Sequence, residues 1–135
     1  MRFVLDCSAS VAWCLDDECD AWADAVLDSL VQGGAVVPAL WPFEMANVLA
    51  IAERRGRVPR AQVAHILALL GSLPIMVDPG PPAPLMAALD SLAREHRLTA
   101  YDAASLELGL RHGVPIATRD VELRRAARDA GGSLV

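Results

Sequence analysis

The chain has 135 residues, of which 54% are hydrophobic, 21% charged and only 4% aromatic, and its formal net charge is −5. This length suits one domain, residues 1–135, that buries about two-thirds of its unfolded surface. An acidic chain is not an obvious nucleic-acid binder. The sequence has no run of roughly 18 apolar residues and no signal-peptide stretch at its start, so we expect a soluble, cytoplasmic protein without a membrane span.

Short apolar runs alternate with longer helical patterns, which is typical of βαβ units around a parallel sheet. The predicted strands are residues 2–6, 35–38, 75–78 and 115–118, with 133–135 as a candidate fifth. The predicted helices are residues 8–15, 18–32, 41–56, 59–73, 85–96, 101–113 and 121–131. The one evident loop is PGPPAP, residues 79–84. The pattern therefore predicts an α/β fold.

Four acidic residues fall where such a fold would place a functional site. Ligands of open parallel sheets bind at the carboxyl ends of the strands, where the following helices begin. Asp6 closes the first predicted strand and Asp120 follows the fourth. Asp102 opens a helix, and Glu44 lies in the first turns of another. We therefore expect these four carboxylates to converge on one edge of the sheet.

Three of these acids also have a structural interpretation. Asp6 suits the turn into the next helix, Asp102 completes a Thr99-x-x-Asp102 capping box, and Asp120 suits an N-cap. Glu44 is different because apolar residues surround it, and a buried charge is costly unless it is paired or bound to a metal. The chain has no Lys to pair with it.

The residue types decide which metal such a cluster would favour. Magnesium and manganese take oxygen ligands, so carboxylates without His or Cys suit Mg²⁺ or Mn²⁺. The cysteines, Cys7, Cys14 and Cys19, are odd in number and form no C-x-x-C pair, which argues against a disulfide framework or a zinc site. They are better explained as small core or helix-face side chains.

All basic residues other than His are Arg, and most of them fall in two clusters. The clusters are Arg54, Arg55, Arg57 and Arg60, and Arg124, Arg125 and Arg128. Arg suits bidentate contact with phosphate, although solvated helix ends explain the clusters equally simply. Arg119, beside Asp120, has the same two interpretations, contact with RNA phosphate or exposure to solvent.

The residues resemble the PIN-domain ribonucleases, and more closely the VapC-like toxins of bacterial toxin–antitoxin pairs. The resemblance covers nearly the whole chain. It is carried by FVLDCSASVAW, VPALWPFEMANVLAIAERRGR, LPIMVD and LTAYDAASLELGLRHGVPIATRDVELRRAARDAG. It implies a three-layer α/β/α fold around a central, mostly parallel sheet of four or five strands, and Mg²⁺- or Mn²⁺-dependent cleavage of single-stranded RNA.

The resemblance also assigns residues and partners. It implies catalytic and metal-binding roles for Asp6, Glu44, Asp102 and Asp120, with support from Ser8, Asn47 and Thr118. Hydrogen bonds from the supporting residues would orient the acids, although capping or turn formation explains them equally well. The implied partners are an RNA substrate, a cognate antitoxin that lays an amphipathic segment near the acids, and a second copy of the chain.

Two other classes remain open on the sequence. A PIN-like fold used only for binding would normally have lost an acid, and none is missing here. Receiver domains and haloacid-dehalogenase-like phosphatases also have an acid after the first strand, but they typically need a Lys in the site. Dinucleotide binding is disfavoured because no G-x-G-x-x-G follows the first strand.

Overall fold

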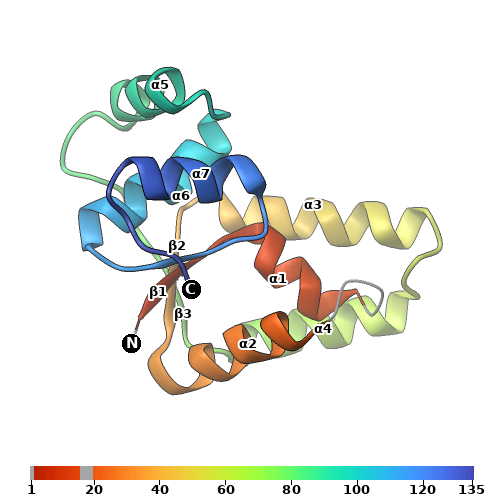
Figure 1. Ribbon diagram of the computed structural model, residues 1–135. Coiled ribbons are helices and arrows are strands. Elements are labelled where there is room, and N and C mark those ends of the chain that lie inside the picture. The colour runs from red at the N-terminus through yellow and green to blue at the C-terminus, as the bar shows by residue number, and fades with distance from the viewer. Residues whose placement is uncertain (1, 16–19) are drawn as a thin grey trace.

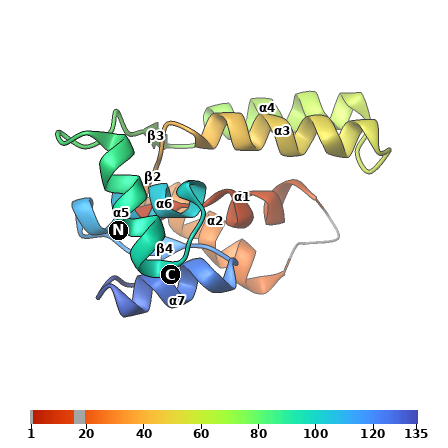
Figure 2. The same ribbon diagram turned by 90° about the horizontal axis from the view of Figure 1, so that it is seen from above.

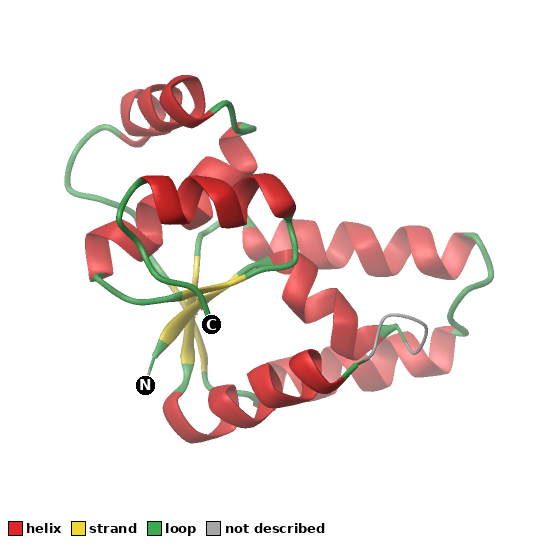
Figure 3. Cartoon of the chain, in the orientation of Figure 1, coloured by secondary structure: helices red, strands yellow, loops and turns green. Residues whose placement is uncertain are grey.

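The computed structural model describes residues 2–15 and 20–135, in which a four-stranded parallel sheet lies among helices (Figures 1 and 3). The strands are β1 (Phe3–Leu5), β2 (Ala35–Val37), β3 (Ile75–Val77) and β4 (Ile116–Ala117). The helices of this part of the chain are α1 (Cys7–Cys14), α2 (Ala21–Gly33), α3 (Trp41–Arg54), α4 (Arg60–Ser72), α5 (Leu85–His96), α6 (Ala100–His112) and α7 (Val121–Asp129). The predicted α/β class is therefore confirmed.

The strand order is β3-β2-β1-β4, so the first strand lies inside the sheet. Val4 is paired with Val36 of β2 on one side and with Ile116 of β4 on the other. Because the strands are parallel, their carboxyl ends meet at one edge of the sheet. Helices α1, α3 and α7 begin close after β1, β2 and β4, and thus start at this edge.

Each face of the sheet is covered by a layer of helices. Alternate residues of β1 point to opposite faces: Phe3 and Leu5 join one buried cluster, and Val4 joins the other. The first cluster includes residues of α1, α2, α3 and α4, and the second includes residues of α6 and α7. The arrangement is the three-layer α/β/α fold that the resemblance implied.

Helices α3 and α4 form a pair that projects from the sheet and is joined by a loop at its far end (Figures 1 and 2). Arg54, Arg55, Arg57 and Arg60 lie at this end and are exposed. Arg60 pairs with Glu53 at 3.2 Å. The first arginine cluster therefore lies on the solvated tip of the pair.

Two glycines set close approaches between helices and strands. Gly34, which ends α2, has a φ of 79°, and a Cβ there would lie 3.2 Å from the carbonyl oxygen of Pro74. Gly109 lies inside α6, and a Cβ at this position would meet Cγ1 of Ile116 at 2.7 Å. Helix α6 therefore lies against β4 at a distance that only a glycine allows.

The structure corrects two details of the predicted elements. Residues 133–135 form no fifth strand, because β4 has only two residues and pairs with this segment through one isolated bridge, Ile116 to Leu134. The helix predicted over 18–32 begins at Ala21, where the Asp20 side chain caps it. Residues 18 and 19 lie outside the described part of the chain. Among the described residues, no helix is long and apolar enough to cross a membrane.

Candidate metal centre at the carboxyl edge of the sheet

Asp6 directly follows β1 and is buried, with only 6% of its surface exposed. Its Oδ2 accepts hydrogen bonds from the hydroxyls of Ser8 at 2.8 Å and Thr118 at 2.9 Å. The same oxygen caps α1 by accepting from the backbone N–H of Ser8 at 3.4 Å. Asp6 is thus a helix cap and also a fixed carboxylate at the sheet edge.

Ser8 and Thr118 join the start of α1 to the turn between β4 and α7. Their hydroxyl oxygens lie 3.1 Å apart. The backbone N–H of Arg119 donates to Ser8 Oγ at 2.9 Å, and that of Asp120 donates to Thr118 Oγ1 at 3.1 Å. Two of the three predicted supporting residues therefore lie against Asp6 and fix the backbone around it.

Ser105 supplies a third hydroxyl to Asp6, and it is not among the site residues predicted from the sequence. It lies in α6 and is buried, and its Oγ donates to Asp6 Oδ1 at 3.1 Å. The signal was its position three residues after Asp102, one helical turn along the same face. Within the small-residue stretch DAAS, however, Ser105 looks like an ordinary position for helix packing.

Glu44 and Asp102 are partly buried and electrostatically coupled to Asp6. Burial, followed by the negative charges of Asp6 and Asp102, raises the pKa of Glu44 to about 7. Burial, followed by the charges of Asp120 and Asp6, raises the pKa of Asp102 to about 6. The four predicted acids therefore lie close enough to repel one another, as convergence on one edge requires.

Asp120 caps α7, because its Oδ1 accepts from the backbone N–H of Leu123 at 2.8 Å. Thr99 caps α6 through a hydrogen bond of 3.1 Å from the backbone N–H of Asp102 to its Oγ1. The helix caps predicted at Thr99 and Asp120 are therefore present. The carboxylates of Asp102 and Asp120 still contribute negative charge to the cluster.

Asn47, the remaining predicted supporting residue, lies on α3 one turn after Glu44 and is exposed. Its side chain makes no hydrogen bond to any residue in the described part of the chain. The structure therefore places it near Glu44 along the helix, without the contacts to Asp6 that Ser8 and Thr118 make.

The donor set at the sheet edge fits a hard divalent cation. All four acids offer carboxylate oxygens, and none forms an ion pair with a basic side chain among residues 2–15 and 20–135. A cation between them would relieve the repulsion that raises the pKa values of Glu44 and Asp102. Over the same residues, no three His, Cys, Asp or Glu side chains are already gathered as a ready-made metal site. Mg²⁺ usually keeps several water ligands, so the protein need not supply all of its ligands.

Asp78, which follows β3, is a buried acid at the same edge that has a different role. Arg111 donates to it at 2.5 Å, His112 Nε2 lies 3.0 Å from it, and the Gly80 N–H donates at 2.8 Å. The hydrogen bond from Arg111 is the main reason that the pKa of Asp78 is lowered to about 2. This acid is neutralised within the protein and is not a member of the cation-binding set.

The sequence matches the PIN domain family over residues 3–129, and the chain belongs to this family. PIN domains are typically metal-dependent nucleases, and they generally use divalent metal ions. The carboxylates at the sheet edge lie inside the matched region. Among curated proteins, no match to the chain was found.

Solved structures share the fold. The crystal structure of PAE2754 from Pyrobaculum aerophilum is 25% identical and superposes with a TM-score of 0.74, covering 99% of this chain and 88% of that one. FitAcB from Neisseria gonorrhoeae is 21% identical with a TM-score of 0.65, covering 95% of this chain and 94% of that one. FitAB bound to an IR36 DNA fragment is 18% identical with a TM-score of 0.56, covering 100% and 94%.

Proposed function

We propose that this chain is a Mg²⁺- or Mn²⁺-dependent endoribonuclease and the toxin of a toxin–antitoxin pair in the cytoplasm. The observation that carries the proposal is the coupling of Glu44 and Asp102 to the buried Asp6, with no basic side chain neutralising them in the described structure. A PIN domain that retains this acidic set has the ligands that a metal-dependent nuclease requires.

Different residues of the chain would have different roles in such a metal site. Asp6, fixed by Ser8, Thr118 and Ser105, offers a carboxylate of defined orientation. When bound, a divalent ion lowers the pKa of a water molecule and stabilises charge on the phosphoryl oxygens during in-line attack. The remaining acids, Glu44, Asp102 and Asp120, complete the oxygen donor set. With a divalent ion held by these acids, the acidic edge would attract the phosphates of RNA.

The assignment as a toxin rests on two observations. The sequence resembles VapC-like toxins over nearly its whole length, and its fold is similar to those of FitAcB and of FitAB, the latter solved with a DNA fragment. We therefore propose an antitoxin protein as a partner, encoded by the adjacent gene.

A homodimer is part of the proposal. A mostly apolar cavity of about 260 Å³ lies between α3, α5 and α6, and its lining includes Phe43 and Leu85. These two residues and the neighbouring Met86 are exposed, Phe43 by 78% and Met86 by 86%. Apolar patches of this kind usually mark an interface. Light scattering on the purified protein is expected to give the mass of a dimer.

Cleavage of a labelled single-stranded RNA tests the enzymatic part. We expect products with Mg²⁺ or Mn²⁺, none with chelator, and none from Asp102→Asn, whose fold should stay intact. The matched control is Asp90→Asn, an exposed acid of α5 that pairs with Arg94, and it should cleave as wild type does. Cleavage by Asp102→Asn, or by the wild type in chelator, would refute the proposed site. Failure of the protein to co-purify with the product of the adjacent gene would refute the toxin assignment alone.

A further inference from the structure

A second, polar cavity of about 390 Å³ lies beside the acids. It is lined by Asp20, Trp22, Thr118, Arg119 and Arg124. Thr118 belongs to both places, because its Oγ1 donates to Asp6 and the residue also lines the cavity. The cavity and the acidic cluster therefore share Thr118.

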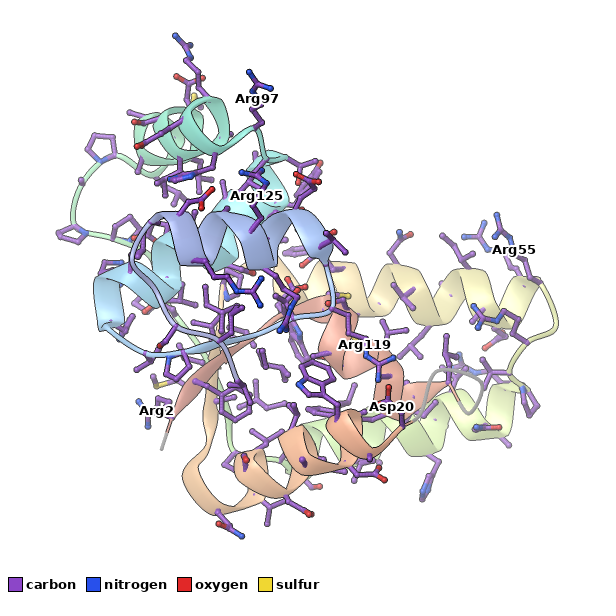
Figure 4. The ribbon with its side chains drawn as sticks, viewed as in Figure 1. Arg2, Asp20, Arg55, Arg97, Arg119 and Arg125 are labelled. Carbon is purple, nitrogen blue, oxygen red and sulfur yellow. The ribbon has the colours of Figure 1, made fainter. Side chains whose placement is uncertain are left out.

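Arg119 is held in a defined position on the wall of this cavity. Its guanidinium pairs with Asp20 and lies 5.2 Å from the centre of the Trp22 ring, a cation–π distance. Figure 4 shows its side chain extending from the turn before α7 toward Asp20 at the start of α2. Its backbone N–H donates to Ser8, so both ends of the residue are fixed.

Arg124 brings a second guanidinium to the cavity from the first turns of α7. Its Nη1 donates to the carbonyl oxygen of Thr118 at 3.0 Å, which directs the side chain to the end of β4. No carboxylate in the described part of the chain pairs with it. Its neighbour Arg125, by contrast, is engaged by Glu122 and Asp129. Arg124 thus retains a positive charge at the cavity for a ligand from outside.

We propose that Arg119 and Arg124 form a subsite for a backbone phosphate of single-stranded RNA, next to the phosphate that is cleaved at the acids. The inference rests on the proposed function and adds a specific place for the substrate strand. Two guanidiniums suit a phosphodiester because their planar donors match its oxygens. A strand with one phosphate at the acids would place a neighbouring phosphate across Thr118 in this cavity.

Among the described residues, Asp20 competes with a substrate phosphate for this subsite. Its carboxylate forms an ion pair with Arg119 in the free protein, and a phosphate of the substrate replaces this carboxylate when RNA binds. The oxygen that pairs with Arg119, Oδ1, also caps α2 by accepting from the backbone N–H of Ala23 at 2.9 Å. Asn is as good an N-cap as Asp, so Asp20→Asn removes the competing charge while the cap remains.

The two guanidiniums also reduce the electrostatic repulsion between this acidic chain and RNA. The chain carries a net charge of −5, which opposes the approach of RNA. Positive charge beside the acids focuses the strand where it is cleaved. The exposed arginines at the tip of α3 and α4 lie away from the sheet edge and are placed less well for this purpose (Figure 4).

Binding of a fluorescent ten-nucleotide single-stranded RNA, measured by polarisation over a series of salt concentrations, tests the subsite. All proteins carry Asp102→Asn so that the probe is not cut. We expect Arg119→Ala and Arg124→Ala each to weaken binding about fivefold to tenfold and to lower the salt slope by about 0.7, the loss of one phosphate contact. Arg124→Lys should retain most of the affinity. The matched control Arg128→Ala, an exposed arginine on the same helix, should bind as the parent does.

Asp20→Asn distinguishes the proposed competition from a purely structural role of Asp20. We expect this variant to bind RNA more tightly than the parent, which the loss of a structural contact would not cause. Parent-like affinity and salt slope in both alanine variants would overturn the subsite. Unchanged or weaker binding by Asp20→Asn would overturn the competition. Should Arg124→Ala lose its fold by thermal melting, Arg124→Gln replaces it. Cleavage by the wild-type protein judges the proposed function separately, so a failed subsite and a failed nuclease give different results.

Discussion

The Ser105 hydroxyl of α6 donates a hydrogen bond of 3.1 Å to Oδ1 of Asp6, the residue that ends β1. This bond joins a helix on one face of the sheet to the sheet edge, and it occupies the oxygen that Ser8 and Thr118 leave open. Because Asp102 lies one turn before Ser105, the same contact fixes the position of α6 that brings Asp102 near Asp6. Ser105 thereby positions two acids at once.

Ser105→Ala should therefore lower both stability and activity. A hydrogen bond to a buried charged group is lost, which costs about 1.5–3 kcal/mol in the free energy of unfolding. Cleavage should fall, with Mg²⁺ needed at higher concentration, because Asp6 is less well oriented. Urea unfolding and a metal titration of activity measure the two effects. Ser91→Ala, at an exposed position of α5, should change neither, and equal behaviour of the two variants would contradict the role given to Ser105.

The raised pKa values of Glu44 and Asp102 predict how stability depends on pH without metal. The folded-state pKa of Glu44 is about 7 against an ordinary 4.5, and that of Asp102 is about 6 against 3.8. Both groups bind protons more readily when folded, so their contribution is most favourable below about pH 4 and is lost as the pH rises toward 7. Melting in chelator should show this loss between pH 4 and 8.

Glu44→Gln should flatten that dependence and melt above the wild type at pH 8, because the ionised carboxylate is then absent. Added Mg²⁺ should stabilise the wild type at pH 8 more than the variant, since a ligand that binds the folded state raises its stability. A variant with the wild-type pH profile would show that Glu44 is not coupled to the other acids.

Two substitutions separate the capping role of Asp120 from its charge. Asp120→Ala removes both, and the loss of the cap to Leu123 should cost about 0.5–2 kcal/mol in chelator. Asp120→Asn keeps a cap but removes the charge, so its stability in chelator should equal or exceed that of the wild type. Both variants should show a smaller rise in melting temperature with Mg²⁺. An undiminished rise in Asp120→Asn would make Asp120 a cap alone.

The pair of Asp78 and Arg111 predicts a purely structural effect. Arg111→Ala leaves a buried carboxylate without its main partner and should cost about 3 kcal/mol. Asp78 stabilises the wild type above about pH 3.8, and this contribution is lost as the pH falls through about 2. The variant should therefore unfold in acid at a higher pH. Arg94→Ala, which breaks the exposed pair with Asp90, should lower stability little in the same titration. An equal loss of stability in the two variants would contradict the argument that burial makes the Asp78–Arg111 pair more important.

The sequence predicted the parts of the site that depend on strand ends. Asp6 and Asp120 follow runs that are recognisable as strands, and parallel strands bring such positions to one edge whatever their separation along the chain. Glu44 was predictable because an acid among apolar residues needs an explanation. Local pattern is enough for these three residues.

Other contacts could not be predicted because they depend on how the helices are placed on the sheet. Ser105 reaches Asp6 across 99 positions of the sequence. Arg119 meets Asp20 and Trp22 only because the turn before α7 packs against the start of α2. No periodicity along the chain encodes such distances. The candidate fifth strand over residues 133–135 could not be judged from the sequence for a related reason. The number of positions at which it can pair depends on the length of β4 in the folded protein.

Gly109 carries a consequence for how this protein can be inactivated. A single methyl group at this position would collide with the Ile116 side chain, so either Ile116 or α6 must shift. Because α6 also carries Asp102 and Ser105, a shift of α6 would pull both away from Asp6 although neither is altered. For the proposed toxin, a growth selection for inactive variants would thus recover changes at Gly109 as well as at the acids. Positions at which a substitution can inactivate the protein therefore extend along α6 to Gly109, about two turns beyond Asp102.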